Sequence, residues 1–186
     1  MSVAFSPDSK RLAAVSVFNG IKIWDAATGS SLPVLEISAR FGIAIAFSAD
    51  GKRLALDETE SVIKLFDAET GTIMQTLKGF GGPVTSVAFT ADGQHLVSGS
   101  EDGLVKIWAV SIDACPLTVE DHDKPASSIA ISADGLQVIS GSIDATIKIW
   151  DTETGRYLQT LKGPHKVINF MIFSADSKRL VSCSDD

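Results

Sequence analysis

Residues 131–151 read ISADGLQVISGSIDATIKIWD, and both halves of this stretch recur along the chain, each copy starting 42 residues after the one before it. The first half occurs as FSPDSKRL from Phe5, FSADGKRL from Phe47, FTADGQHL from Phe89, ISADGLQV from Ile131 and FSADSKRL from Phe173. The end of the second half occurs as KIWD from Lys22, KLFD from Lys64, KIWA from Lys106 and KIWD from Lys148. A fixed repeat of this length predicts units that cannot bury an apolar face alone and that share cores by stacking.

Within one repeat, short apolar stretches alternate with turns that contain Gly. Asp-Gly pairs supply tight hairpin turns because Gly adopts positive φ without steric cost, and β-branched and aromatic residues favour strands. We expect strands at 86–89, 95–98 and 104–108 in the third copy and at 157–162 in the fourth. No helical period extends over a useful length. The pattern predicts an all-β fold in which one repeat forms a four-stranded propeller blade.

Composition narrows the classes of partner. The 186 residues carry a formal net charge of −7, which argues against nucleic acid because binding to phosphates draws on clustered Lys and Arg. Protein or peptide partners are therefore expected. Cys115 and Cys183 give no disulfide framework, and no stretch predicts a signal peptide or a membrane-inserted helix. These features favour a cytoplasmic protein.

Residues 140–151, SGSIDATIKIWD, together with the preceding His122, resemble the signature of the WD-repeat β-propellers, and the likeness extends over essentially the whole chain. The resemblance implies a structural hydrogen-bond network in each blade, which joins a loop His, a strand Ser or Thr, a turn Asp and a strand Trp. His122, Ser140, Asp144 and Trp150 match all four places. Such a network satisfies polar groups between two turns and fixes the turns together.

The other copies keep only part of this network. The third copy has Ser98, Asp102 and Trp108, with Phe80 in the place of the His. The first copy keeps Trp24 but has Ala14 and Phe18 in other places, and the second has Ser38, Leu56, Glu60 and Phe66. Because each buried hydrogen bond contributes about 1 kcal/mol, we expect the first two blades to be less rigid than the fourth.

One repeat region extends over residues 1–186. We expect four full blades, approximately 1–36, 43–78, 84–120 and 127–162, and a partial fifth at 167–186. Closed propellers have about four to eight blades, so we expect the chain to be a fragment of a larger ring. The alternative is a self-contained open arc. In either case, self-association through open blade edges is expected.

No catalytic residue, metal site or cofactor is predicted. His122, Ser140 and Asp144 have the residue types of a nucleophilic triad, but this Ser lies in an expected strand and not on a sharp turn with oxyanion donors. The Asp-Gly pairs read as hairpin turns because no twelve-residue calcium loop surrounds them. The Lys residues at 22, 64, 106 and 148 are expected to pack their stems and solvate their tips, which is favoured over a phosphate-binding row.

The loops that vary between copies are the candidates for partner binding. Loops at one end of the blades are expected to crowd one face, where rigid strands hold them. Aromatic and charged residues there predict a protein-binding rim. The candidate rim residues are Phe18, Arg40, Phe41, Glu58, Glu60, Phe80, Glu101, Lys124, Ile143 and His165. Phe18 and Phe80 could equally fill the space left by missing network residues.

A non-catalytic protein-interaction scaffold is the function that these observations favour. The regular copies resemble the repeat arrays of fungal and bacterial NOD-like receptor sensors and also those of WD-repeat adaptors of the mitochondrial fission type. A propeller enzyme is less favoured because no convergent polar constellation lies outside the repeat positions. A chromatin- or RNA-associated module is less favoured because of the acidic balance.

Overall fold

The computed structural model describes residues 2–16, 20–32, 44–59, 61–110, 117–120, 122–162 and 166–185. Every regular element in these ranges is a β-strand, and none is a helix. The strands are β1 Ser2–Phe5, β2 Arg11–Ser16, β3 Gly20–Asp25, β4 Ile45–Phe47, β5 Arg53–Thr59, β6 Val62–Asp67, β7 Ile73–Lys78, β8 Val84–Phe89, β9 His95–Ser100, β10 Leu104–Ala109, β11 Leu117–Glu120, β12 Ala126–Ile131, β13 Gln137–Ser142, β14 Thr146–Asp151, β15 Tyr157–Lys162, β16 Ile168–Phe173 and β17 Leu180–Ser184.

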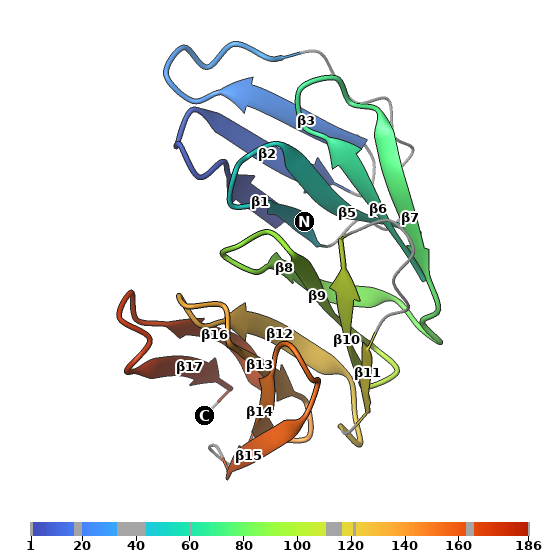
Figure 1. Ribbon diagram of the computed structural model, residues 1–186, viewed down its shortest axis with the longest axis vertical. Coiled ribbons are helices and arrows are strands. Elements are labelled where there is room, and N and C mark those ends of the chain that lie inside the picture. The colour runs from blue at the N-terminus through green and yellow to red at the C-terminus, as the bar shows by residue number, and fades with distance from the viewer. Residues whose placement is uncertain are drawn as a thin grey trace.

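The strands form five antiparallel meanders that follow one another along an arc (Figure 1). Three sheets have four strands each, in the orders β4 to β7, β8 to β11 and β12 to β15. The described part of the first sheet has β1, β2 and β3, and the last sheet is the hairpin of β16 and β17. We call these sheets blades one to five, and the strands within a blade a, b, c and d. The predicted all-β propeller architecture, in which the blades do not close into a ring, is confirmed.

Repeat positions determine local geometry as well as fold. In blades two, three and four the turn between strands a and b contains Gly51, Gly93 and Gly135 at positive φ. Ser9 and Ser177 occupy the same repeat position with φ of 58° and 55°. A side chain in this conformation costs about 1 to 2 kcal/mol, so the surrounding turn must hold these two serines in place.

Each turn between strands a and b is closed by a Ser or Thr hydroxyl that donates to an Asp two residues later. The donor–acceptor distances are 2.5 to 2.6 Å in all five blades. These hydroxyls and a backbone N–H hold the pKa of each carboxyl below its usual range. We call these five side chains the turn carboxylates: Asp8, Asp50, Asp92, Asp134 and Asp176.

The core is divided among the junctions between neighbouring blades. At the junction of blades three and four, Val97 and Val105 of one blade pack with Ile129 and Trp150 of the next. The same four repeat positions contribute to the clusters at the first two junctions, and three of them contribute to the cluster at the last junction. Each blade therefore has a trailing face, which meets the following blade, and a leading face, which meets the preceding one. Burial of apolar surface at these junctions stabilises the arc.

Side chains of the following blade that pack directly on the backbone explain two repeated glycines in strand b. A Cβ added at Gly141 would lie 2.7 Å from Ile168 Cγ2 and 3.0 Å from the Met171 side chain. At Gly99 it would lie 3.1 Å from the Cβ of Ala126. In both places the strand a of the next blade occupies the space that a side chain would need.

Arginine side chains add polar contacts across two junctions. Arg11 donates to the carbonyl oxygens of Gly51 at 2.6 Å and Ala68 at 2.9 Å. Arg53, one repeat later, donates to the carbonyl of Gly93 at 3.2 Å. These contacts connect strand b of one blade to turns of the next.

The strands fall within the blade ranges expected from the repeat, except that β12 begins at Ala126, one residue before the expected start of blade four. The four expected strands correspond to β8, β9, β10 and β15, of which β8 and β9 are two residues longer and β10 one residue longer. In blade one the third strand is followed by a bridge between Trp24 and Ser31. Residues 33–43 are outside the described part of the chain.

Candidate functional site

Blade four contains a directed chain of hydrogen bonds between two loops and two strands. The indole N–H of Trp150 donates to Ser140 Oγ at 3.0 Å, and Ser140 Oγ lies 2.8 Å from His122 Nε2. His122 Nδ1 lies 3.0 Å from Asp144 Oδ2. Since a carboxylate only accepts, Nδ1 carries a proton, and in the neutral ring Nε2 then accepts from the Ser140 hydroxyl. The structure thus brings together all four residues of the expected network.

Asp144 forms the outer end of this chain of hydrogen bonds. Partial burial raises the pKa of Asp144, but hydrogen bonds from the Thr146 hydroxyl, His122 and the Thr146 backbone N–H outweigh it and hold this pKa below the usual range. The Thr146 hydroxyl donates to Asp144 Oδ1 at 2.6 Å. A carboxylate with this many donors is a strong anchor for the turn that carries it.

The contacts of His122 and Ser140 have the distances of a Ser-His-Asp triad, but the position of the serine excludes that chemistry. Ser140 is completely buried in β13, and its oxygen already accepts the Trp150 N–H. A nucleophile must reach a substrate carbonyl beside oxyanion donors. The three residues therefore serve to fix the loops of blade four.

Blade three keeps the Trp–Ser hydrogen bond of this network, and its turn Asp binds the preceding loop directly. The Trp108 indole N–H donates to Ser98 Oγ at 2.8 Å, as Trp150 does to Ser140. Asp102 Oδ2 accepts the backbone N–H of Gly81 at 2.6 Å, so this carboxylate ties its turn directly to the preceding loop. The loop contact that His122 mediates in blade four is made here without a histidine.

Phe80 is a correction to the candidate rim. Its side chain is buried, and its ring lies 5.4 Å from that of Trp108, with a tilt of 53° between the planes. It fills the space next to Trp108 that the network His occupies in blade four. Phe80 is therefore an internal packing residue and does not belong to an exposed binding surface.

Lys106 departs from the behaviour expected of the lysine row. Lys22 is exposed, but Lys106 is buried, and its Nζ donates to the carbonyl oxygen of Gly79. The ammonium lies 5.0 Å from the Phe80 ring centroid and 5.8 Å from that of Trp108. The faces of the two rings attract the cation, so Lys106 and Phe80 together replace the missing histidine.

The first two blades lack polar networks at the corresponding described positions. Trp24 is half-buried, and its indole makes no hydrogen bond to the residues that the structure describes. In blade two, Leu56 and Phe66 are buried as apolar core. Ser38, Glu60 and Phe18 lie outside the described residues, so lower rigidity of these blades stays a prediction.

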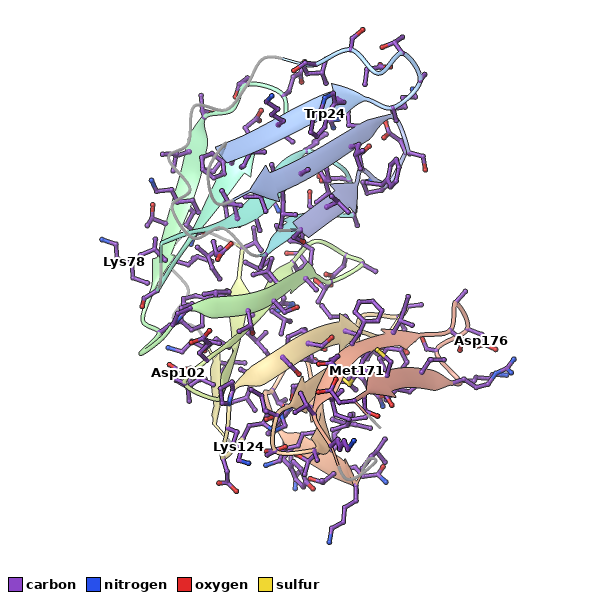
Figure 2. The ribbon with its side chains drawn as sticks, turned by 180° about the vertical axis from the view of Figure 1, so that it is seen from behind. Trp24, Lys78, Asp102, Lys124, Met171 and Asp176 are labelled. Carbon is purple, nitrogen blue, oxygen red and sulfur yellow. The ribbon has the colours of Figure 1, made fainter. Side chains whose placement is uncertain are left out.

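Three of the candidate rim residues lie exposed on the loops of blades three and four: Glu101, Lys124 and Ile143. Figure 2 shows Asp102 and Lys124 on the same side of the molecule and Asp176 on the opposite side. We define the blade 3–4 rim as the exposed residues Glu101, Asp102, Asp123, Lys124 and Ile143. Glu58 belongs to β5, and its side chain is outside the description, as are Arg40, Phe41, Glu60, Phe18 and His165 entirely.

Backbone contacts hold the blade 3–4 rim in one arrangement. Glu101 N–H donates to the Pro83 carbonyl at 2.8 Å, and Ile143 N–H donates to the Pro125 carbonyl at 3.1 Å. A Cβ at Gly103, whose φ is 83°, would collide with the carbonyl oxygen of His122. Turns of one blade thus lie against the loop of the next, and the rim presents its side chains from a rigid base.

Within the described ranges, no group of three or more His, Cys, Asp or Glu residues is placed to hold a metal ion. The same ranges contain no helix long and apolar enough to cross a membrane.

The sequence pattern alone did not predict that Lys106 and Arg11 connect loops or blades. Their signals in the sequence are the loss of the loop histidine in the third copy and the repetition of Arg immediately before Leu at positions 11, 53 and 179.

Comparisons with known proteins agree with this geometry. The family model for the WD domain, G-beta repeat, matches residues 71–109, 113–151 and 155–186, more than half of the chain. No protein in a search of curated sequences matches the chain. The crystal structure of the β-propeller domain of Myceliophteria thermophila Cps50 (Swd1) matches with a TM-score of 0.88 and 16% sequence identity. The match covers 99% of this chain and 61% of that one, and at this identity it shows the fold alone.

The repeat step, the blade sheets and the Trp–Ser–His–Asp chain of hydrogen bonds therefore lead to one conclusion. The chain belongs to the WD40 family, whose propellers generally act as non-catalytic protein-interaction scaffolds.

Proposed function

We propose that the blade 3–4 rim is the surface through which this scaffold binds a protein or peptide partner. The observation that carries the proposal is a set of exposed side chains on loops that are fixed by backbone hydrogen bonds and by the buried network of blade four. Fixed loops lose little conformational freedom on binding, which favours affinity. The rim combines one apolar residue, Ile143, with mainly acidic neighbours.

The charge of the rim indicates the chemistry of its partner. Glu101, Asp102 and Asp123 carry negative charge around the single cation of Lys124. Complementary potentials steer association and suppress the wrong partners. We therefore expect a protein segment with basic side chains and at least one apolar anchor, and we do not expect nucleic acid or membrane insertion.

We place this scaffold in the cytoplasm, as the repeat region of a larger adaptor or of a NOD-like receptor sensor. The close similarity and constant step of the copies support this proposal, and the exposed free thiol of Cys183 is compatible with a reducing compartment. A WD-repeat adaptor of the mitochondrial fission type is the second candidate. A nucleotide-binding module encoded in the same reading frame favours the first, and a coiled coil favours the second.

Proximity labelling in cells tests the rim. A triple variant, Glu101→Lys with Lys124→Glu and Ile143→Asp, should lose the partners labelled by the natural chain. The matched control makes similar changes on the opposite face, as Glu153→Lys, Lys52→Glu and Leu136→Asp, and should keep those partners. Retention of the same labelled proteins by both variants would show that the rim is not the binding surface.

A further inference from the structure

A cavity of about 580 Å³ lies inside the arc, between blades one and two, at the end of these blades that carries the turns between strands a and b. Figure 1 shows the strands that border it, β2 and β3 of one blade and β5 and β6 of the next, side by side. Its apolar floor is the edge of the junction core, made of Ile23 and Ala68 with Leu32 packed against them. Sites for small ligands have volumes of about 300 to 1,000 Å³, so the cavity has room for a short peptide segment but not for a folded domain.

Charged side chains of both signs surround this apolar floor. The carboxylates are Asp8, Asp25, Asp67 and Glu69, and the cations are Lys10, Arg11 and Lys52. None of them forms an ion pair with another residue in the described part of the chain. Charge complementarity therefore favours a ligand that itself carries charges of both signs.

Three of the carboxylates are fixed by their own turns through one oxygen each. Asp25 Oδ1 and Asp67 Oδ1 each accept a backbone N–H of the turn between strands c and d at 2.7 Å. Asp8 Oδ1 accepts a backbone N–H at 3.0 Å. Hydrogen bonds from N–H and hydroxyl groups of these turns hold the pKa of all three carboxyls below its usual range. Their Oδ2 atoms accept no hydrogen bond from the residues that the structure describes, so each charged group keeps one oxygen for a cation.

Arg11 gives the cavity a fixed positive charge. Its guanidinium donates to the carbonyl oxygens of Gly51 and Ala68 at 2.6 and 2.9 Å and lies 5.6 Å from the centroid of the Phe47 ring. A guanidinium has five N–H donors, so donors remain for a carboxylate of a ligand. The exposed Lys10 and Lys52 add two further cations to the same lining.

The full set of charged residues occurs at this junction and at no later one in the sequence. One repeat later, Gln94 stands at the position of Lys52, and Ala109 stands at the position of Asp67. The cavity at the junction of blades two and three, of about 500 Å³, has Arg53 as the single cation of its described lining. The charges around the first cavity are therefore not a general consequence of the repeat.

We propose that the cavity between blades one and two binds a short segment of a protein partner in which an apolar residue lies between one basic and one acidic side chain. The basic side chain pairs with the free oxygens of Asp25 and Asp67. The acidic side chain pairs with Arg11, and the apolar side chain covers Leu32. The cavity is separate from the blade 3–4 rim, so this inference is independent of the partner proposed for that surface.

An amide NMR titration of the 186-residue chain with capped tripeptides tests the proposal. We expect acetyl-Arg-Leu-Glu-amide, or the same residues in reverse order, to shift the backbone amide signals of Leu32, Gly51 and Thr70. Acetyl-Arg-Leu-Arg-amide and acetyl-Glu-Leu-Glu-amide should bind about fivefold more weakly, because each loses one ion pair and gains a repulsion. Since the chain has a net charge of −7, attraction to its overall charge would instead favour the doubly basic peptide.

The repeat supplies a matched control for each change in the lining. Asp67→Asn with Glu69→Gln should weaken binding by at least about threefold, while the Asn oxygen still accepts the N–H groups of the turn. Asp151→Asn with Glu153→Gln makes the same changes at the same repeat positions in blade four and should leave binding unchanged.

A second pair of variants tests the cationic side of the cavity. Lys52→Gln should weaken binding of the mixed-charge peptide, and its control Lys178→Gln, at the same repeat position in the last copy, should not. The proposal is overturned if neither mixed-charge peptide shifts the three amide signals, or if the doubly basic peptide binds as tightly. Equal weakening by a lining variant and its control would overturn it as well.

Discussion

Removal of the His122 imidazole should weaken the fold measurably, because this side chain connects both halves of the blade-four network. His122→Ala deletes the 2.8 Å contact to Ser140 and the 3.0 Å contact to Asp144. A neutral buried hydrogen bond contributes about 1 kcal/mol and one to a charged group about 1.5 to 3 kcal/mol. The expected loss is about 2 to 4 kcal/mol, which corresponds to roughly 4 to 16 °C in Tm for a chain of this size.

His95→Ala is the matched control for this change. His95 is half-buried, and its backbone bonds to Thr90 persist in the variant, so the expected loss is below about 1 kcal/mol. Urea unfolding followed by tryptophan fluorescence compares the two. A double variant of His122 and Asp144 should lose less than the sum of the single variants, by about 0.5 to 3 kcal/mol. Equal losses for His122→Ala and His95→Ala would refute the network as a source of stability.

Three further outcomes are expected. Gly103→Ala should destabilise the chain more than Gly93→Ala in urea unfolding. Both glycines have positive φ, but an added Cβ would meet a backbone carbonyl at Gly103 and open space at Gly93. Equal urea midpoints for the two variants would contradict this. Arg11→Ala should cost about 1 to 2 kcal/mol through two lost hydrogen bonds to blade two, and a loss no larger than that of the exposed Lys10→Ala would show that the contact is not stabilising. The pKa of each turn carboxylate is lowered in the folded state. The stability that these carboxylates contribute is therefore fully present above the unfolded value of about 3.9 and should be lost as the pH falls through the lower folded values. Urea midpoints that stay constant from pH 5 to pH 2.5 would rule this out.

The repeat alone determined the architecture and much of the blade-four network. A constant step of 42 residues requires equivalent units, and alternation with glycine turns makes each unit a short antiparallel meander. Strands β9, β10 and β15 begin where the pattern predicts. His122, Ser140, Asp144 and Trp150 were identified through their family spacing, since a network fixed by repeat position has a sequence signature.

Only the tertiary structure decided where the residues that break the repeat lie and what they contact. Phe80 looked equally suited to the rim and to the interior, and its position against Trp108 under the Lys106 ammonium placed it inside. The positive φ of Ser9 carries no sequence signal because glycine is the usual residue there. Burial and side-chain partners are set between units, whereas the sequence pattern describes each unit by itself.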